Sequence, residues 1–293
     1  MNIYDCFMYF DEDLLLDLRL NVLNDHVKKF VITESTFLHS GKEKKLKFDY
    51  KNFNKFKDKI IYIVVDTPPL GIQTIDRSDT TAIKNKKILD NSLKRENNQR
   101  NRLINGLDDV LEDDLILSSD LDEIPNLLNF KFKNKITLFE QKVFYYKFNL
   151  MQPNFNWMGT RACKKKQLKG FQWLRNIKSK SYPGWRLDTF FSEKRYMNID
   201  IVKNGGWHFT SIKKPKDIFY KLSNFMHHLE FEYSGLSLKD MEKMVEEKKI
   251  LYDHGVKQED NKYTGRQSLV KINNLILPEY IRQNLNKYKD WLG

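Results

Sequence analysis

Cysteine and long apolar runs are scarce in this sequence of 293 residues, and each shortage excludes a class of protein. The two cysteines, Cys6 and Cys163, are too few for a disulfide framework and lack zinc-motif spacing, so we expect buried free thiols in a reducing compartment. No apolar run approaches the ~20 residues of a membrane-spanning helix, and no signal peptide is visible. These shortages predict a soluble, cytoplasmic protein of a microbe or of an infected host cell, with no membrane span.

Linkers and internal repeats are missing as well. Because no Gly/Ser-rich segment divides the chain, we expect a single domain over 1–293. Hydrophobic residues make up 40% of the chain and charged residues 31%, which is enough apolar material for a sizeable core in a soluble protein.

The net charge of +12 is distributed unevenly. Residues 161–180 hold eight Lys or Arg and no acid, whereas residues 108–123 hold eight acids and no base. A basic surface attracts phosphate, nucleic acid or anionic lipid, although lysine runs are also common as solvated faces.

The first 125 residues alternate between strand and helix patterns. Apolar runs predict strands at 3–10, 27–33, 60–65 and 114–118, and helical spacing predicts helices at 13–25 and 86–106. This alternation predicts an α/β fold with a mainly parallel, Rossmann-like sheet flanked by helices. Beyond it we expect a strand or hairpin at 136–150, short strand-like pieces over 151–210 and helices over 215–250.

An acidic motif, Asp120-Leu121-Asp122-Glu123, follows the fourth predicted strand directly. Ligands of open α/β sheets bind beyond the carboxyl ends of the strands, so Asp120 and Asp122 are expected to face the crevice there. Paired carboxylates suit a hard cation such as Mn²⁺ or Mg²⁺, which would neutralise the charge of a departing diphosphate. An Asp-x-Asp tripeptide alone is as often an acidic loop or helix cap, and its place after a buried strand favours the metal-binding interpretation.

Four ordered segments resemble glycosyltransferase family 17. They are residues 3–23 (Ile-Tyr-Asp-Cys-Phe at the start), residues 30–42 (Phe-Val-Ile-Thr-Glu-Ser-Thr at the start), Arg95-Glu96 with the acidic motif up to Pro125, and Gly205-Gly206-Trp207-His208-Phe209 with a later His228-x-Glu230. The resemblance implies a GT-A fold, a UDP-sugar donor, Mn²⁺ and an inverting transfer. It also implies a nucleotide-binding half at 1–125 and an acceptor-binding half at 126–293. The basic, aromatic region 161–200 departs from the family pattern.

Roles for the donor site follow from this resemblance. The side chains expected to bind the donor are Glu34, Arg95, Arg100, Asp120, Trp207 and His208. Those expected to hold the metal are Asp120, Asp122 and His208, with Asp122 as the direct ligand. Each has an ordinary alternative: Glu34 as a strand-end cap, Arg100 in a surface pair with Glu96, and Trp207 in core packing.

An inverting transfer needs a general base for the acceptor hydroxyl. The candidates are Asp188, Glu230 and Asp200. Asp188 is favoured because it follows Tyr182-Pro183-Gly184-Trp185-Arg186, a turn with aromatic and cationic groups that would line an acceptor site.

Three functions stay open on the sequence alone. The first is transfer of N-acetylglucosamine or another hexose to a glycan. The second is the same chemistry on a hydroxylated base of phage DNA, which the basic stretch 161–180 with Phe171 and Trp173 would suit. The third is a non-catalytic protein on a transferase fold that binds carbohydrate or nucleic acid. A metal-dependent phosphohydrolase or nuclease is less favoured, because more His and Asp would be expected at other strand ends.

Overall fold

The computed structural model describes residues 1–180, 192–196, 199–253 and 261–293. Its strands are β1 (Ile3–Met8), β2 (Lys29–Ser35), β3 (Ile60–Val65), β4 (Leu115–Asp120), β5 (Glu123–Pro125), β6 (Ile136–Tyr145), β7 (Leu150–Lys164), β8 (Ile199–Val202), β9 (Gly206–Thr210) and β10 (Val270–Lys271). Its α-helices are α1 (Asp13–Leu23), α2 (Thr81–Asn101), α3 (Phe171–Asn176), α4 (Pro215–Leu222), α5 (His228–Ser234), α6 (Leu238–Glu246) and α7 (Glu279–Gln283).

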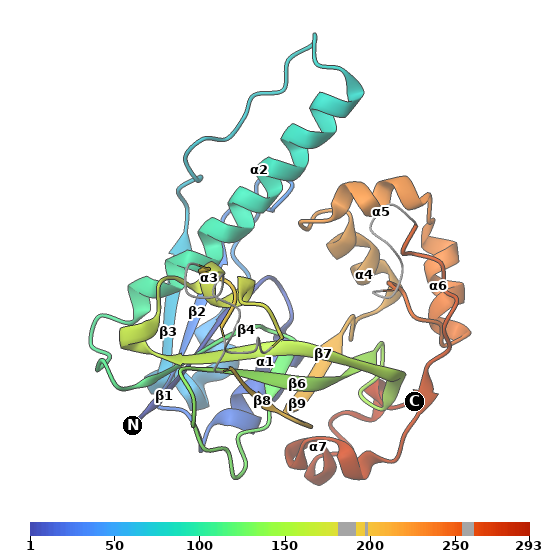
Figure 1. The fold of residues 1–293 in the computed structure, drawn as a ribbon. Helices are drawn as coiled ribbons and strands as arrows, with labels where there is room; N and C mark the ends of the chain where they lie inside the picture. Colours follow the sequence, from blue (N-terminus) through green and yellow to red (C-terminus); the bar gives the residue numbers. More distant parts are fainter. Residues whose placement is uncertain (181–191, 197–198, 254–260) are drawn as a thin grey trace.

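One mixed sheet carries the fold, with the strand order β3-β2-β1-β4-β7-β6-β9-β5, and β10 and β8 pair with β7 and β6 (Figure 1). The expected strand–helix alternation is confirmed for β1 to β4, which run parallel to one another. The expectation of a mainly parallel sheet was wrong, because β7 runs antiparallel to both β4 and β6. Since β6 and β7 are joined by a short turn, they can pair only as an antiparallel hairpin.

The expected elements differ from the observed ones mainly after residue 80. The helix expected at 86–106 begins earlier, at Thr81, and ends in a 3₁₀ turn (Arg102–Gly106). The region 151–210 was expected to hold short strand pieces, but β7 is one continuous strand of 15 residues. Helices were expected over 215–250, and the structure divides this region into α4, α5 and α6.

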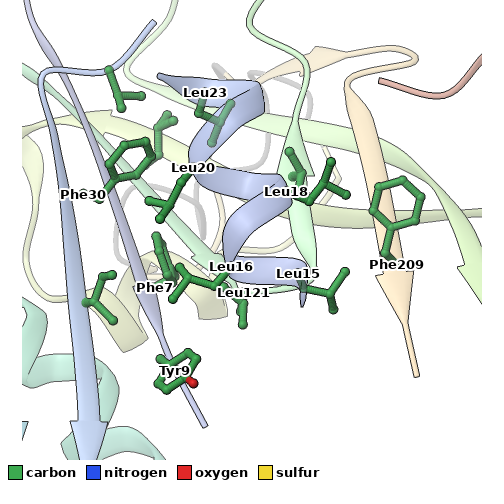
Figure 2. Packing of buried hydrophobic residues seen from close by; sticks show 14 of the residues in the cluster. Phe7, Tyr9, Leu15, Leu16, Leu18, Leu20, Leu23, Phe30, Leu121 and Phe209 are labelled. Atoms are coloured by element: carbon green, nitrogen blue, oxygen red, sulfur yellow. The ribbon is translucent and has the colours of Figure 1, made fainter. Parts of the chain in front are cut away.

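The main core lies between α1 and the parallel strands. In Figure 2, Leu16 of α1 lies toward Phe7 of β1, and Leu121 of the acidic motif lies beside Leu16. Leu121 is buried, so it anchors the motif in the core while its two acidic neighbours remain at the carboxyl end of β4. Burial of each such apolar side chain stabilises the fold by about 1.5–3 kcal/mol.

A second core joins the C-terminal helices to the sheet. Met241 and Met244 of α6 and Ile218 of α4 cluster with Val143 and Tyr145 of β6. Figure 1 shows α2 on one side of the sheet's upper edge and α4, α5 and α6 on the other side.

The cysteines and the apolar content of the helices were both subjects of expectations from the composition. Cys6 and Cys163 are both buried free thiols, as expected. Across the described ranges, no helix is both long enough and apolar enough to cross a membrane.

Candidate active site

A cavity of about 690 Å³ opens where the parallel strands end. Met8, Ser35 and Asp120, the last residues of β1, β2 and β4, all contribute to its wall. Side chains of α2 line one side, and residues from α4 to the start of α5 line another. The acidic motif therefore lies where ligands of open α/β sheets bind.

The backbone of the acidic motif is held from below by a buried arginine. Arg19 of α1 is fully buried and pairs with Asp5, Nη2 to Oδ1 at 2.6 Å. Its Nη1 donates to the carbonyl oxygens of Asp120 and Leu121 at 3.1 Å each, and to that of Glu123 at 2.8 Å. Three carbonyls on one guanidinium fix the path of the turn, so the acidic side chains start from a rigid backbone.

Asp120 is paired with two arginines. Arg100 of α2 approaches Oδ1 at 2.9 Å, and Arg175 of α3 approaches Oδ2 at 2.9 Å. Burial alone would raise the pKa of Asp120, but Arg175 and Arg100 outweigh it and hold that pKa well below its usual range. Asp120 is therefore a charged carboxylate with an arginine on each oxygen.

Glu123 belongs to the same network and is buried. Arg175 Nη1 lies 2.6 Å from Glu123 Oε2, and Trp157 Nε1 donates to Glu123 Oε1 at 2.7 Å. A buried carboxylate with this many donors is a structural anchor. Gly159 makes the packing possible, since a Cβ there would lie 1.9 Å from Gln141 Oε1 and 3.2 Å from Glu123 Cδ.

Asp122 and His208 come together from distant segments. Asp122 Oδ1 lies 3.6 Å from His208 Nε2, and both side chains line the cavity. The pairing of β5 with β9, which sets Glu123 opposite His208, produces this contact. Burial alone would lower the pKa of His208, but the carboxylate of Asp122, with Glu123 behind it, raises that pKa above its ordinary value.

The two glycines before Trp207 permit this approach. A Cβ on Gly206, whose φ is +138°, would lie 2.2 Å from the carbonyl oxygen of Ile124, and one on Gly205 would lie 2.6 Å from that of Val202. Only a residue without a side chain fits either position. The glycines therefore bring β9 close enough to carry His208 to the cavity.

The donor atoms suit a divalent cation in part. One carboxylate oxygen and one imidazole nitrogen, 3.6 Å apart on a cavity wall, are donor types that suit Mn²⁺, and they would be two of its ligands if a substrate supplied the others. His208 Nδ1 is buried and has no hydrogen-bond partner among the residues that the structure describes. Within the described ranges, no three His, Cys, Asp or Glu side chains gather as metal ligands. Asp120 was the third expected ligand, but each of its carboxylate oxygens is paired with an arginine.

Three of the side chains expected at the donor site do not line the cavity. The Glu34 carboxylate accepts hydrogen bonds from Tyr62 Oη at 2.8 Å and from the backbone of Lys47 at 2.7 Å, and it pairs with Lys44. Arg95 donates to the carbonyl of His39 at 3.1 Å, and Trp207 Nε1 donates to that of Ile276 at 2.7 Å. Glu34 thus shapes the cavity indirectly, through Lys44 on its wall.

The three candidate bases have different positions. Asp188 lies outside the described residues. Asp200 pairs with Thr137 along β8 and is not part of the cavity wall. Glu230 of α5 also lies off the wall, but its Oε1 is 3.2 Å from Nδ1 of His227, and His227 does line the cavity.

Sequence patterns missed two arginines of the site, Arg161 and Arg175, because both lie in the basic stretch 161–180. Arg161 of β7 lines the cavity and donates to the carbonyl of Leu174 at 3.1 Å. Burial and the nearby Arg175 lower the pKa of Arg161 to about 9. Both are arginines in a stretch whose other cations are all lysines. This difference was the available signal, because arginine is preferred over lysine at buried and interface positions.

Three consecutive lysines of the same stretch have exposed carboxylates for partners. Lys164 and Lys166 lie 2.7 and 2.8 Å from Asp113, and Lys165 lies 3.8 Å from Glu112. The basic stretch and the acidic block 108–123 therefore neutralise each other in part, which reduces the charge available for nucleic-acid phosphates.

Carboxylates, arginines and a histidine around one cavity at the strand ends are typical of enzymes that act on anionic substrates. The family model described as Glycosyltransferase family 17 matches residues 1–292. The chain therefore belongs to glycosyltransferase family 17, whose reaction is glycosyl transfer. A comparison with curated proteins found no match.

Proposed function

We propose that this protein transfers N-acetylglucosamine or another hexose from a UDP-sugar to a hydroxyl of a glycan, with inversion at the transferred carbon. The observation that carries this proposal is the meeting of Asp122 and His208 in a cavity that also holds an arginine network. Family membership supplies the reaction class, and the cavity supplies groups suited to a diphosphate.

The donor site is proposed to lie between Asp122, His208 and the arginines on Asp120. Mn²⁺ or Mg²⁺ would be held by Asp122 and His208 and would neutralise charge on the departing diphosphate. Asp120 holds Arg100 and Arg175 in place beside that diphosphate. The parallel strands β1 to β4 support a GT-A-like arrangement in which residues 1–125 form the nucleotide-binding half.

The acceptor is proposed to enter from the side of residues 126–293. Tyr145, Trp157, Tyr252 and Tyr263 of the cavity wall offer aromatic faces for sugar rings. As the acceptor oxygen bonds to the donor's C1, the bond from C1 to the β-phosphate oxygen breaks, and its electron pair leaves with UDP. The hydroxyl proton passes to His227, which Glu230 orients from behind at 3.2 Å.

The DNA-acceptor alternative is less favoured, because Lys164, Lys165 and Lys166 are paired with acids. Binding to duplex DNA, measured against salt, tests it. We expect weak, sequence-independent binding. Tight binding with a steep salt dependence would revive this alternative. The non-catalytic alternative is less favoured because Asp122 and His208 are both present at the cavity.

The experiment is a panel of nucleotide sugars, each with Mn²⁺, with Mg²⁺ or with EDTA. Release of nucleoside diphosphate and the thermal shift are measured for each donor. One UDP-sugar is expected to stabilise the protein and to be slowly hydrolysed in the presence of Mn²⁺. Asp122→Asn should abolish both effects, and Asp200→Asn, a matched change outside the cavity wall, should leave both unchanged. If no nucleotide sugar has any effect on the wild-type protein, the proposal fails.

A further inference from the structure

Among the described residues, Arg161 differs from the other arginines of the cavity in forming no ion pair with a carboxylate. Arg100 pairs with Glu96 and Asp120, and Arg175 pairs with Asp120 and Glu123. In the described part of the chain, Arg161 contacts one hydrogen-bond acceptor, the carbonyl of Leu174, and its Nε is buried without a partner. Most of its five N–H donors are therefore unused by the protein.

The position of Arg161 is fixed by the middle of the sheet. On β7 it is paired with Ser118 of β4 on one side and with Leu138 of β6 on the other. A residue held between two neighbouring strands cannot swing its backbone toward solvent, so the guanidinium remains at the cavity wall. A cation placed this way destabilises the folded chain unless something else compensates its charge.

The nearby carboxylates of Glu123 and Asp120 attract Arg161 from a distance, but among the described residues neither forms an ion pair with it. Both oxygens of Asp120 already accept from arginines, and both oxygens of Glu123 accept from Arg175. The third cation has thus been added to a network whose acids are already engaged. An anion arriving in the cavity would meet Arg161 with donors still available besides the one that binds the carbonyl of Leu174.

We infer that Arg161 binds the diphosphate of the donor, so that its guanidinium receives the negative charge released when the sugar leaves. This inference rests on the proposed function and names a residue for its leaving group. Arginine suits the task because its planar fork offers two parallel N–H donors to a phosphate. In the transfer, the electron pair of the broken C1–O bond stays on the β-phosphate oxygen, and Arg161 stabilises that oxygen without exchanging a proton.

A single substitution of Arg161 should lower the affinity for UDP without lowering the stability of the fold. Arg161→Met keeps an unbranched apolar side chain in place of the aliphatic part of arginine and removes the charge and the donors. The affinity for UDP, measured by titration calorimetry, should fall about tenfold or more, which is the value of one or more charge-assisted hydrogen bonds. Uridine affinity should not change. Without ligand, the melting temperature of Arg161→Met should equal or exceed that of the wild type, because a largely buried cation that forms no direct ion pair with the described residues has been removed.

Two further variants control the measurement. Arg161→Lys keeps the charge without the fork, and its affinity for UDP should be intermediate. Lys169→Met removes one charge from the same basic stretch at an exposed position and should leave the UDP affinity unchanged.

The outcomes distinguish this inference from the proposed function. If the wild type binds UDP and Arg161→Met binds it equally well, the inference is overturned and the proposed function stands. If Arg161→Met melts lower and loses affinity for UDP and uridine alike, Arg161 is structural, which also overturns the inference. If the wild type binds no nucleoside diphosphate, both are overturned.

Discussion

Asp122 and His208 place a carboxylate oxygen and an imidazole nitrogen 3.6 Å apart, although one follows β4 and the other lies on β9. Three features of the surrounding structure hold these two side chains in contact. Arg19 fixes the turn that carries Asp122, Leu121 anchors this turn in the core, and Gly206 lets β9 approach β5.

Arg19→Met should destabilise the fold strongly. The change leaves the Asp5 carboxylate buried without its partner and frees three carbonyls of the acidic turn, and loss of one partner of a buried pair costs about 3–5 kcal/mol. Urea unfolding measures the loss. Arg102→Met, at an exposed position, should change the free energy of unfolding by less than about 0.5 kcal/mol. Equal stabilities of the two variants would contradict the role assigned to Arg19.

Gly206→Ala should cost more than Gly235→Ala. Both glycines have positive φ, but a Cβ at Gly206 would also collide with the carbonyl of Ile124. A Cβ at Gly235 would meet no atom of the described residues within 4 Å. We expect about 1 kcal/mol at Gly235 from backbone strain alone, and clearly more at Gly206. Chemical denaturation of both variants gives the comparison. A Gly206→Ala protein as stable as Gly235→Ala would show that the close approach of β9 is not required.

Glu12 should make stability depend on pH at the acid end. Burial alone would raise its pKa, but Lys221, at 2.8 Å, and Lys213 outweigh burial and lower the pKa to about 2 from an ordinary value of 4.5. Because the folded pKa is the lower one, this stabilisation is fully present above pH 4.5 and is lost as the pH falls toward 2.

The free energy of unfolding of the wild type should therefore exceed that of Glu12→Gln at pH 6, and the gap should narrow between pH 4.5 and 2. Glu246→Gln, at an exposed position, serves as the control and should follow the wild type throughout. A gap between the wild type and Glu12→Gln that does not change with pH would contradict the ion pair with Lys221.

The parallel half of the fold followed from sequence because its strands are unbroken apolar runs, such as Ile60–Val65. The strand β7 did not, because polar residues such as Asn156 are typical of loops, and Asn156 belongs to the strand through its pairing with Lys142 of β6. Arg161 looked like surface charge for a similar reason, since no local pattern shows which cation of a basic stretch turns inward.

The acidic motif was predicted from its carboxylates and its place after a buried strand, and His208 was predicted from the resemblance of Gly205-Gly206-Trp207-His208-Phe209 to the family pattern. Trp207 and His208 were both assigned to the donor, although adjacent residues of a strand point to opposite faces, and only His208 lines the cavity. Arg95 and Arg100 differ likewise, since they lie on different faces of α2 and only Arg100 reaches the motif. The side-chain periodicity of a strand and of a helix would have excluded one residue of each pair from the predicted donor site.

The central claim is that Asp122 and His208 together with a divalent cation hold the donor's diphosphate. Titration of UDP, with and without Mn²⁺, into the wild type, Asp122→Asn and His208→Ala tests it most directly. Mn²⁺ should tighten UDP binding to the wild type about tenfold or more and should have little effect on either variant. If Mn²⁺ tightens UDP binding equally in all three proteins, or in none, the account of this site is contradicted.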